Sequence, residues 1–432
     1  MFTKHSFSPA VSIFKRVMKI EKNAEFLINL LNGEGFECFA VGGCVRDSIM
    51  GKPPDDWDLC TSASPQEIKG AFDKAKIACL EYGIKHGTLT AIIDSKAYEI
   101  TSFRAEGSYS DFRHPDKVVF LKDIDSDLAR RDFTVNAMAY SPKTGLIDLF
   151  GGQEDIGARI IRCVGNPENR FNEDALRILR ALRFCSTLNF TADDKTKRAV
   201  LRKKELLQSI SRERINKEFF KLLSGDSAAK ILNEYRCVFS VLLPEIDAVC
   251  AVKGAWEKMI KTIDYLPPKP EIRLCALARS IKQAAGENAL ASAMSSLRLS
   301  RRQTQLIESV ARFSPFTPEA DEKNILKQLR LTGKEVFSVL LEIYKAESLA
   351  ADPPDKNALH TAQKAQEIFT DITAKGKPYT INSLKVDGND IKSLGFYGEQ
   401  IGQCLENLLD HVIDGTLDNE KSVLIKYIKN KK

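Results

Sequence analysis

The stretch FAVGGCVRDSIMGKPPDDWDLC, residues 39–60, decides the fold of the first part of this chain. Its first residues are apolar and suit a short strand, and Gly42 and Gly43 then turn the chain. Residues without side chains let backbone N–H groups approach a phosphate closely. Arg46 follows the turn and supplies a positive charge suited to phosphate. The stretch therefore predicts a strand that leads into a phosphate-binding turn.

A pair of carboxylates, Asp56 and Asp58, closes the same stretch. On a strand, residues two apart share a face, with Cα atoms roughly 6 to 7 Å apart, which suits two carboxylates that bind shared divalent ions. A solvated turn after two prolines is the alternative, and the neighbouring Asp55 favours it. Trp57 and Leu59 alternate with the acids and should face a core. We therefore predict that Asp56 and Asp58 bind Mg²⁺.

A third carboxylate is expected where a phosphoryl-transfer site activates an attacking hydroxyl. The candidate is Glu99 in AYEITSFR, where Glu99 and Thr101 would share one face of a strand. We predict that Glu99 completes the catalytic carboxylates.

The surrounding residues, about 20–150, alternate short β-branched runs with helix-like segments such as Pro65 to Lys76. From about Asn166 onward, Leu-, Ala- and Lys-rich segments of helical period replace the strand signals. The fold class is therefore α+β, with a mixed sheet and helices first and an all-helical remainder. Prolines at 267–270, 314–318 and 353–354 mark possible boundaries.

The segment NPENRFNEDALRILRALRF, residues 166–184, predicts an arginine-bearing helix. Asn172 would cap it, with Asp174 in its first turn. Arginines then recur at every third position along one face, at Arg177, Arg180 and Arg183. A solvated charged face is the usual meaning of such a pattern. The absence of lysine from this stripe favours binding of phosphates or base edges instead.

Asp174 and Arg177 predict a specific choice of base. On their pairing edges, cytosine and adenine each present an amino donor beside a ring-nitrogen acceptor. A carboxylate acceptor beside a guanidinium donor complements both. Uracil and guanine present the reverse arrangement, and a mismatch would leave buried polar groups unpaired at a cost of a few kcal/mol. The pair should therefore accept C and A and reject U and G.

The whole chain has the composition of a folded protein. Its 432 residues suggest two to four structural units, and 43% are hydrophobic and 28% charged. The net charge of +6 fits a polyanionic partner but also an ordinary surface. The 10 cysteines show no Cys-x-x-Cys pair, and no apolar run approaches the roughly 20 residues of a membrane span. We expect a cytoplasmic protein.

Six motifs together resemble one family, the class II CCA-adding tRNA nucleotidyltransferases and the related bacterial poly(A) polymerases. They are GGCVRD (42–47), DWD (56–58), RRDFTVNAMAY (130–140), DLFGGQEDI (148–156), EDALRILRALRF (173–184) and ERINKEF (213–219).

The resemblance implies a polymerase-beta-like nucleotidyltransferase head, then a neck, body and tail. The expected ranges are 1–22 for an N-terminal extension, 23–165 for the head, 166–225 for the neck, 226–352 for the body and 353–432 for the tail. Body and tail would bind the acceptor stem and T arm of tRNA.

The resemblance also implies roles for single residues. The metal ligands would be Asp56 and Asp58, with Glu99 as the third carboxylate. The nucleotide-binding residues would be Gly42, Gly43, Arg46, Arg131, Asp174, Arg177, Arg180 and Arg183. The tRNA 3′-hydroxyl would attack the α-phosphate of CTP or ATP at a two-metal site and release pyrophosphate.

Alternatives within and outside this family remain open at this point. Residues 102–120 resemble a loop that is incomplete in relatives adding only CC, so C-and-A or A-only addition is favoured. A poly(A) polymerase shares the head motifs, although the end of the chain resembles CCA-adding enzymes more closely. A non-catalytic RNA-binding protein is the alternative of another class.

Overall fold

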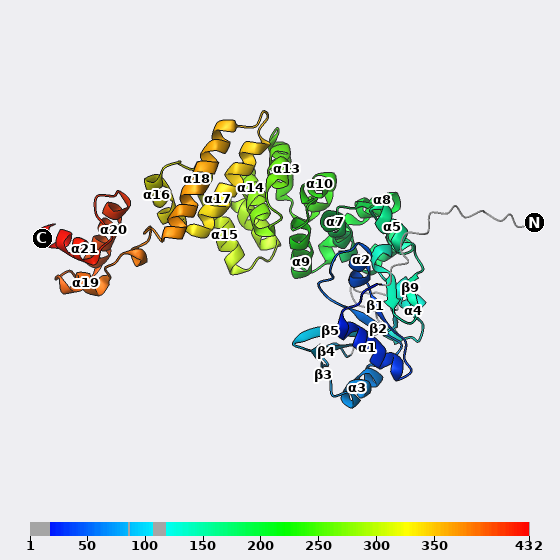
Figure 1. Ribbon diagram of the computed structural model, residues 1–432. Coiled ribbons are helices and arrows are strands. Elements are labelled where there is room, and N and C mark those ends of the chain that lie inside the picture. Colours follow the sequence, from blue (N-terminus) through cyan, green and yellow to red (C-terminus); the bar gives the residue numbers. More distant parts are fainter. Residues whose placement is uncertain (1–17, 85–86, 107–117, 432) are drawn as a thin grey trace, which may run out of the picture. The chain divides into compact units, whose positions relative to one another are not determined.

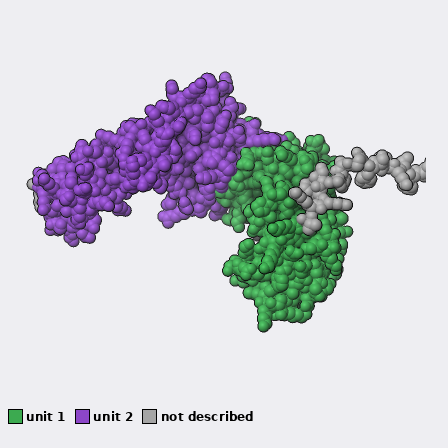
Figure 2. Space-filling model, in the orientation of Figure 1, with its two compact units in different colours: residues 1–227, 235–242 green, residues 228–234, 243–432 purple. Residues whose placement is uncertain are grey.

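The computed structural model describes residues 18–84, 87–106 and 118–431. The chain forms two compact units (Figure 2). The first comprises residues 1–227 and 235–242, and the second comprises residues 228–234 and 243–432. The neck–body border expected at 225/226 stays a prediction. The loop expected to decide between CC and CCA addition lies largely at 107–117, outside the described residues.

The first unit is built on a seven-stranded mixed sheet with the order β3-β4-β5-β2-β1-β8-β9 (Figure 1). Within this sheet β2 and β5 pair in parallel, and the other pairs of adjacent strands are antiparallel. The sheet strands are β1 (Cys38–Val41), β2 (Leu59–Thr61), β3 (Ala78–Leu80), β4 (Thr88–Ile93), β5 (Lys96–Ser102), β8 (Met138–Ser141) and β9 (Gly145–Asp148). Two small pairs add β6 (Arg104–Glu106) with β7 (Val118–Phe120), and β10 (Ile160–Ile161) with β11 (Thr191–Ala192).

Helices surround this sheet and continue beyond it in the same unit. They are α1 (Lys22–Gly33), α2 (Gly43–Ile49), α3 (Pro65–Lys74), α4 (Ile124–Ala129), α5 (Gly152–Ala158), α6 (Pro167–Glu173), α7 (Leu176–Leu188), α8 (Asp194–Lys203), α9 (Arg212–Leu223) and α11 (Arg236–Leu242), with 3₁₀ turns η2 (Thr134–Asn136) and η3 (Lys204–Ser209). Helix α3 shows why the predicted segment is helical: Ser64 and Glu67 form a capping box, and Ile68 and Phe72 are buried. The predicted α+β class is confirmed.

The arginine segment differs from the prediction at its start. The chain forms two helices there, because α6 begins at Pro167 with Asn166 as its N-cap and ends at Glu173. Asp174 then adopts an extended conformation, and its Oδ1 accepts a hydrogen bond from Leu176 N at 3.0 Å. Asn172 therefore lies inside α6 and caps nothing. The break places Asp174 before the arginine helix α7 instead of in its first turn.

The described part of the second unit is helical. Its elements are α10 (Ala228–Glu234), α12 (Glu245–Ala251), α13 (Ala255–Tyr265), α14 (Pro270–Ser296), α15 (Arg301–Arg312), α16 (Glu322–Thr332), α17 (Lys334–Ala350), α18 (Lys356–Lys375), η4 (Ile381–Ser383), α19 (Gly388–Ser393), α20 (Glu399–Ile413) and α21 (Lys421–Lys431). Helix α14 is interrupted at Gly286, whose φ of 84° is not helical.

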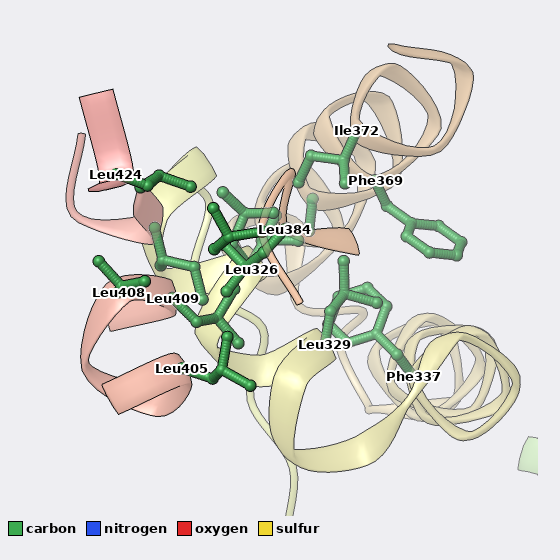
Figure 3. Close-up of a cluster of buried hydrophobic side chains, with 14 of the residues drawn as sticks. Leu326, Leu329, Phe337, Phe369, Ile372, Leu384, Leu405, Leu408, Leu409 and Leu424 are labelled. Atoms are coloured by element: carbon green, nitrogen blue, oxygen red, sulfur yellow. The ribbon is translucent and has the colours of Figure 1, made fainter. Parts of the chain in front are cut away.

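One apolar cluster continues through the end of this unit (Figure 3). It joins Leu329 of α16 and Phe337 of α17 to Phe369 of α18 and to Leu408 and Leu424 of the last helices. Pro353, where we expected the tail to begin, lies between α17 and α18, and the cluster includes residues on both sides of it. No helix among the described residues is long and apolar enough to cross a membrane.

Close packing at Gly152 yields a test of the first unit. A Cβ at Gly152, the first residue of α5, would lie 2.5 Å from Thr134 O and 2.8 Å from Met138 Sδ. Gly152→Ala should therefore reduce the free energy of unfolding by about 2 kcal/mol in urea titrations. Gly157→Ala in the same helix meets nothing within 4 Å and should be neutral or stabilise by about 0.5 kcal/mol. Equal effects of the two changes would contradict the packing argument.

Candidate active site

Asp56 and Asp58 lie directly before β2 in an extended segment. Val41 N donates a hydrogen bond to Asp58 O at 3.0 Å, which continues the β1–β2 pairing one residue beyond the strand. Trp57 and Leu59 are 9% and 1% exposed, whereas both acids are exposed. The predicted alternation is confirmed, although the acids precede the strand instead of lying within it.

Sheet register brings Glu99 beside this pair. The parallel pairing of Leu59 with Ile100 puts Asp58 next to Glu99, each on the face opposite its buried neighbour. The pKa of Asp58 is raised by partial burial, by the charge of Glu99 and by that of Asp56, against an opposing effect of Arg131. Negative charge is thus concentrated at one place, and a divalent cation would relieve it.

The fit to a metal ion rests on two carboxylates. Within the described residues, no three His, Cys, Asp or Glu side chains are gathered so that they could hold a metal together. Mg²⁺ is commonly bound by one or two carboxylates together with substrate phosphates and water. Asp56 and Asp58 fit that mode, in which a nucleotide supplies the remaining oxygen ligands.

The glycine turn makes room for an arginine. Gly42 has a φ of 81° and a ψ of −129°, a conformation that residues with a Cβ rarely adopt. A Cβ on Gly42 would lie 3.1 Å from Arg131 Nη1. Arg131 Nη2 in turn donates to the buried Asp127 at 3.1 Å. Gly42 therefore lets Arg131 pack against the turn, a reason that the sequence does not reveal.

Arg46 of α2 is held rigidly. Its guanidinium makes two 2.9 Å bonds to Asp47 and donates to Asn136 Oδ1 at 2.6 Å, and Arg46 is 8% exposed. Asn136 also donates to Asp132 Oδ1 at 3.3 Å. Gly43 is close by, since a Cβ there would lie 3.6 Å from Arg46 Nη2. Two neighbouring side chains thus hold in place the positive charge that was predicted after the turn.

Asp132 connects the head motifs to the arginine helix. Its Oδ2 accepts hydrogen bonds from Arg180 Nε at 2.8 Å and from Nη2 at 2.5 Å. Burial acts to raise the pKa of Asp132, but Arg180 and Asn136 overcome it and lower that pKa to about 2. Asp132 and Asn136 belong to RRDFTVNAMAY, yet sequence reasoning assigned neither a role.

Asp174 and Arg177 contact different neighbours. Asp174 Oδ2 accepts from Arg214 Nη2 of α9 at 2.8 Å. Arg177 donates to Glu173 Oε2 at 2.6 Å and to Arg130 O at 3.2 Å. Arg177 is 8% exposed, so the predicted alternative of a solvated face is wrong at this position.

Arg183 is the least satisfied of the three arginines on α7. Its Nε lies 2.9 Å from Glu218 Oε2 of α9, but both atoms are buried and their geometry forms no hydrogen bond. Burial lowers the pKa of Arg183 to about 10, only partly opposed by Glu218. Arg214 and Glu218 both lie in ERINKEF, a motif whose residues sequence reasoning left without roles.

Family models and relatives of known function match this chain. Residues 38–162 match the family model described as the poly A polymerase head domain, and residues 189–250 match that of a probable RNA- and SrmB-binding site of polymerase A. A CCA-adding enzyme of Enterococcus faecalis is 32% identical over 95% of this chain and 96% of its own length. One of Bacillus cytotoxicus is 33% identical over 95% and 99%.

Solved structures are similar over almost the whole length. The crystal structure of Bacillus stearothermophilus CCA-adding enzyme in complex with CTP has a TM-score of 0.73 and 28% identity, covering 94% of this chain and 96% of that one. Thermotoga maritima CCA-adding enzyme complexed with tRNA_CCA has a TM-score of 0.60 and 19% identity, covering 96% and 97%. The second likeness concerns the fold alone.

The low pKa of Asp132 predicts a pH-dependent loss of stability. A carboxylate whose pKa falls from 3.8 to about 2 on folding stabilises the protein above pH 4, and this contribution disappears as the pH falls toward 2. Asp132→Asn should therefore cost about 2 kcal/mol near pH 7, and the gap to the unmodified protein should shrink below about pH 4. Urea titrations at several pH values measure it. Asp226→Asn, at an exposed position, should show no such gap.

Proposed function

The chain belongs to the family of CCA-adding enzymes, and we propose that Asp56 and Asp58 are the metal-binding carboxylates of its active site. Enzymes of this family are nucleotidyltransferases that add C, C and A to the 3′ end of tRNA, with CTP and ATP as substrates. The observation that carries the proposal is the register of β2 and β5, which puts Glu99 next to Asp58, while burial and the charges of Glu99 and Asp56 raise the pKa of the Asp58 carboxyl. A divalent cation would stabilise such a group.

The reaction exchanges one phosphoanhydride bond for a phosphodiester. The tRNA 3′-oxygen attacks the α-phosphorus of CTP or ATP, the bond to the β-phosphate oxygen breaks, and pyrophosphate leaves. Nucleotidyl transfer in this family depends on metal, and we infer that the ion is Mg²⁺, which would polarise the α-phosphate and help deprotonate the hydroxyl. Glu99 would add negative charge beside the two ligands.

We propose that four arginines hold the triphosphate. They come from the turn and α2, from the RRDFT segment and from α7, and they are Arg46, Arg131, Arg180 and Arg183, with Gly42 and Gly43 leaving room for the phosphates. Arg46 and Arg180 are oriented by Asn136 and Asp132, so little conformational entropy remains to be lost when a phosphate binds. The under-satisfied Arg183 would gain most from an added anion.

Base selection is proposed for Asp174 and Arg177, with a part for Arg214. Asp174 accepts two hydrogen bonds, from Leu176 N and Arg214, of the roughly four that a carboxylate can accept. It can therefore receive the amino group of cytosine or adenine while Arg214 stays bound. Arg177 donates from Nη2 to Arg130 O, and we propose that this guanidinium also donates to the ring nitrogen of the base.

The remaining assignments extend the proposal to the whole chain. We propose that residues 23–165 are the head, 166–225 the neck, 226–352 the body and 353–432 the tail, and that body and tail bind the acceptor stem and T arm. A cytoplasmic location is also proposed, because tRNA is handled there and all 10 cysteines are free thiols, the form expected in a reducing compartment.

A direct assay separates the proposed reaction from its rivals. Purified protein is given tRNA that ends at the discriminator base, with CTP, ATP, UTP or GTP singly and then CTP with ATP. We expect two C from CTP alone and three nucleotides ending in A from the mixture. Unlimited A addition would instead indicate a poly(A) polymerase, and no use of CTP would indicate an A-only enzyme. Absence of any incorporation would leave the RNA-binding alternative.

Substitution of the carboxylates tests the metal assignment. Asp56→Asn and Asp58→Asn should each lower nucleotide incorporation roughly 1,000-fold or more while tRNA binding in gel-shift assays is kept. Asp55→Asn provides the matched control, because Asp55 is an exposed neighbour in the same segment and should keep near-normal activity. Substantial turnover by the Asp58 variant would show that the metal ligands lie elsewhere.

A further inference from the structure

Three guanidinium groups surround one aromatic ring in the first unit. The guanidinium carbons of Arg46, Arg180 and Arg183 lie 5.3, 5.6 and 3.9 Å from the centroid of the Phe184 ring. Phe184 is 6% exposed, so water covers little of the ring. The arginines come from α2 and from two positions on α7, and the ring is therefore the feature that all three share.

Each of these arginines has its own carboxylate partner, and the three carboxylates lie on three different segments of the chain. Asp47 of α2 binds Arg46, Asp132 before η2 binds Arg180, and Glu218 of α9 lies beside Arg183. These acids balance the charges, but within the described residues no single one of them contacts all three guanidiniums. The ring of Phe184 instead attracts all of them toward one point, since an aromatic face is electronegative and attracts cations most strongly where water is excluded.

The ring itself is held in place. Phe133, which is fully buried, packs against Phe184 with ring centroids 5.7 Å apart and an interplanar angle of 78°. This edge-to-face contact fixes the orientation of the Phe184 ring and adds no charge beside it. The side chain can therefore act as a rigid support for groups that would otherwise repel one another.

We propose that Phe184 is a positioning residue that holds Arg46, Arg180 and Arg183 in the arrangement required by the triphosphate of the incoming nucleotide. This inference rests on the proposed function of those arginines. Because every nucleotide carries the same triphosphate, the effect of Phe184 falls on CTP and ATP alike. This effect of Phe184 is separate from the proposed base selection, which involves Asp174 and Arg177.

Fluorinated phenylalanines test the electrostatic part of this role without changing the shape of the core. Replacement of Phe184 by mono-, di- and trifluorophenylalanine in the full-length chain removes negative charge from the ring face stepwise. We expect the KM values for CTP and ATP to rise together along the series, roughly tenfold in total, with a smaller change in kcat. The dissociation constant of inorganic tripolyphosphate, measured by calorimetry, should rise in parallel, and the midpoint of thermal unfolding should stay constant.

Phe219 provides the matched control. It is 1% exposed and packs against Phe239 with ring centroids 5.9 Å apart, so the same fluorinated series there should leave KM and tripolyphosphate binding unchanged. Unchanged KM and tripolyphosphate binding along the Phe184 series would overturn the inference, as would unequal changes for CTP and ATP or an equal response at Phe219. A wild-type chain that adds no nucleotide would refute the proposed function, and the tripolyphosphate titrations would still decide the role of Phe184.

Discussion

The ion pair between the buried Asp132 and the half-buried Arg180 is the contact on which the arrangement of the site depends. It joins a loop of the sheet region to the arginine helix α7, and the side chain of Asp132 is largely removed from solvent. A charge left unpaired there would be costly, so the two elements must keep their relative position. Asn136 extends the network from Asp132 to Arg46, which sets the position of α2 as well.

The site separates charge into an acidic and a basic region. Asp56 and Asp58 before β2 and Glu99 in the middle of β5 raise the local negative potential, while Arg46, Arg180 and Arg183 gather around Phe184. Arg131 acts between them, since its charge opposes the rise in the Asp58 pKa. A metal-bound nucleotide triphosphate carries both charges in the same order, cation and then phosphates. The charges of the two regions would thus be complementary to those of such a ligand.

Local patterns allowed prediction of the features that depend on a few neighbouring residues. The alternation of Trp57 and Leu59 with the two acids was sufficient to place those acids on one face. In the structure Trp57 and Leu59 are buried, as this pattern predicts. The parallel pairing of β2 with β5, which brings Glu99 beside Asp58, has no local signal because the strands are far apart in sequence. The partner of Asp174 was missed for the same reason, since Arg214 is 40 residues away.

The break between α6 and α7 has a consequence for base selection. In one continuous helix, Asp174 and Arg177 would be three residues apart on one face and would pair directly. The extended conformation of Asp174 turns its carboxylate toward Arg214 of α9 instead, so the position of this acceptor depends on how α9 packs against α7. The chain packs tightly just beyond the end of α9, at Gly225, where a Cβ would lie 2.5 Å from the backbone carbon of Ser186 in α7. The proposed base selection by Asp174 would therefore depend on the packing of α9 as well as on the two residues that would touch the base.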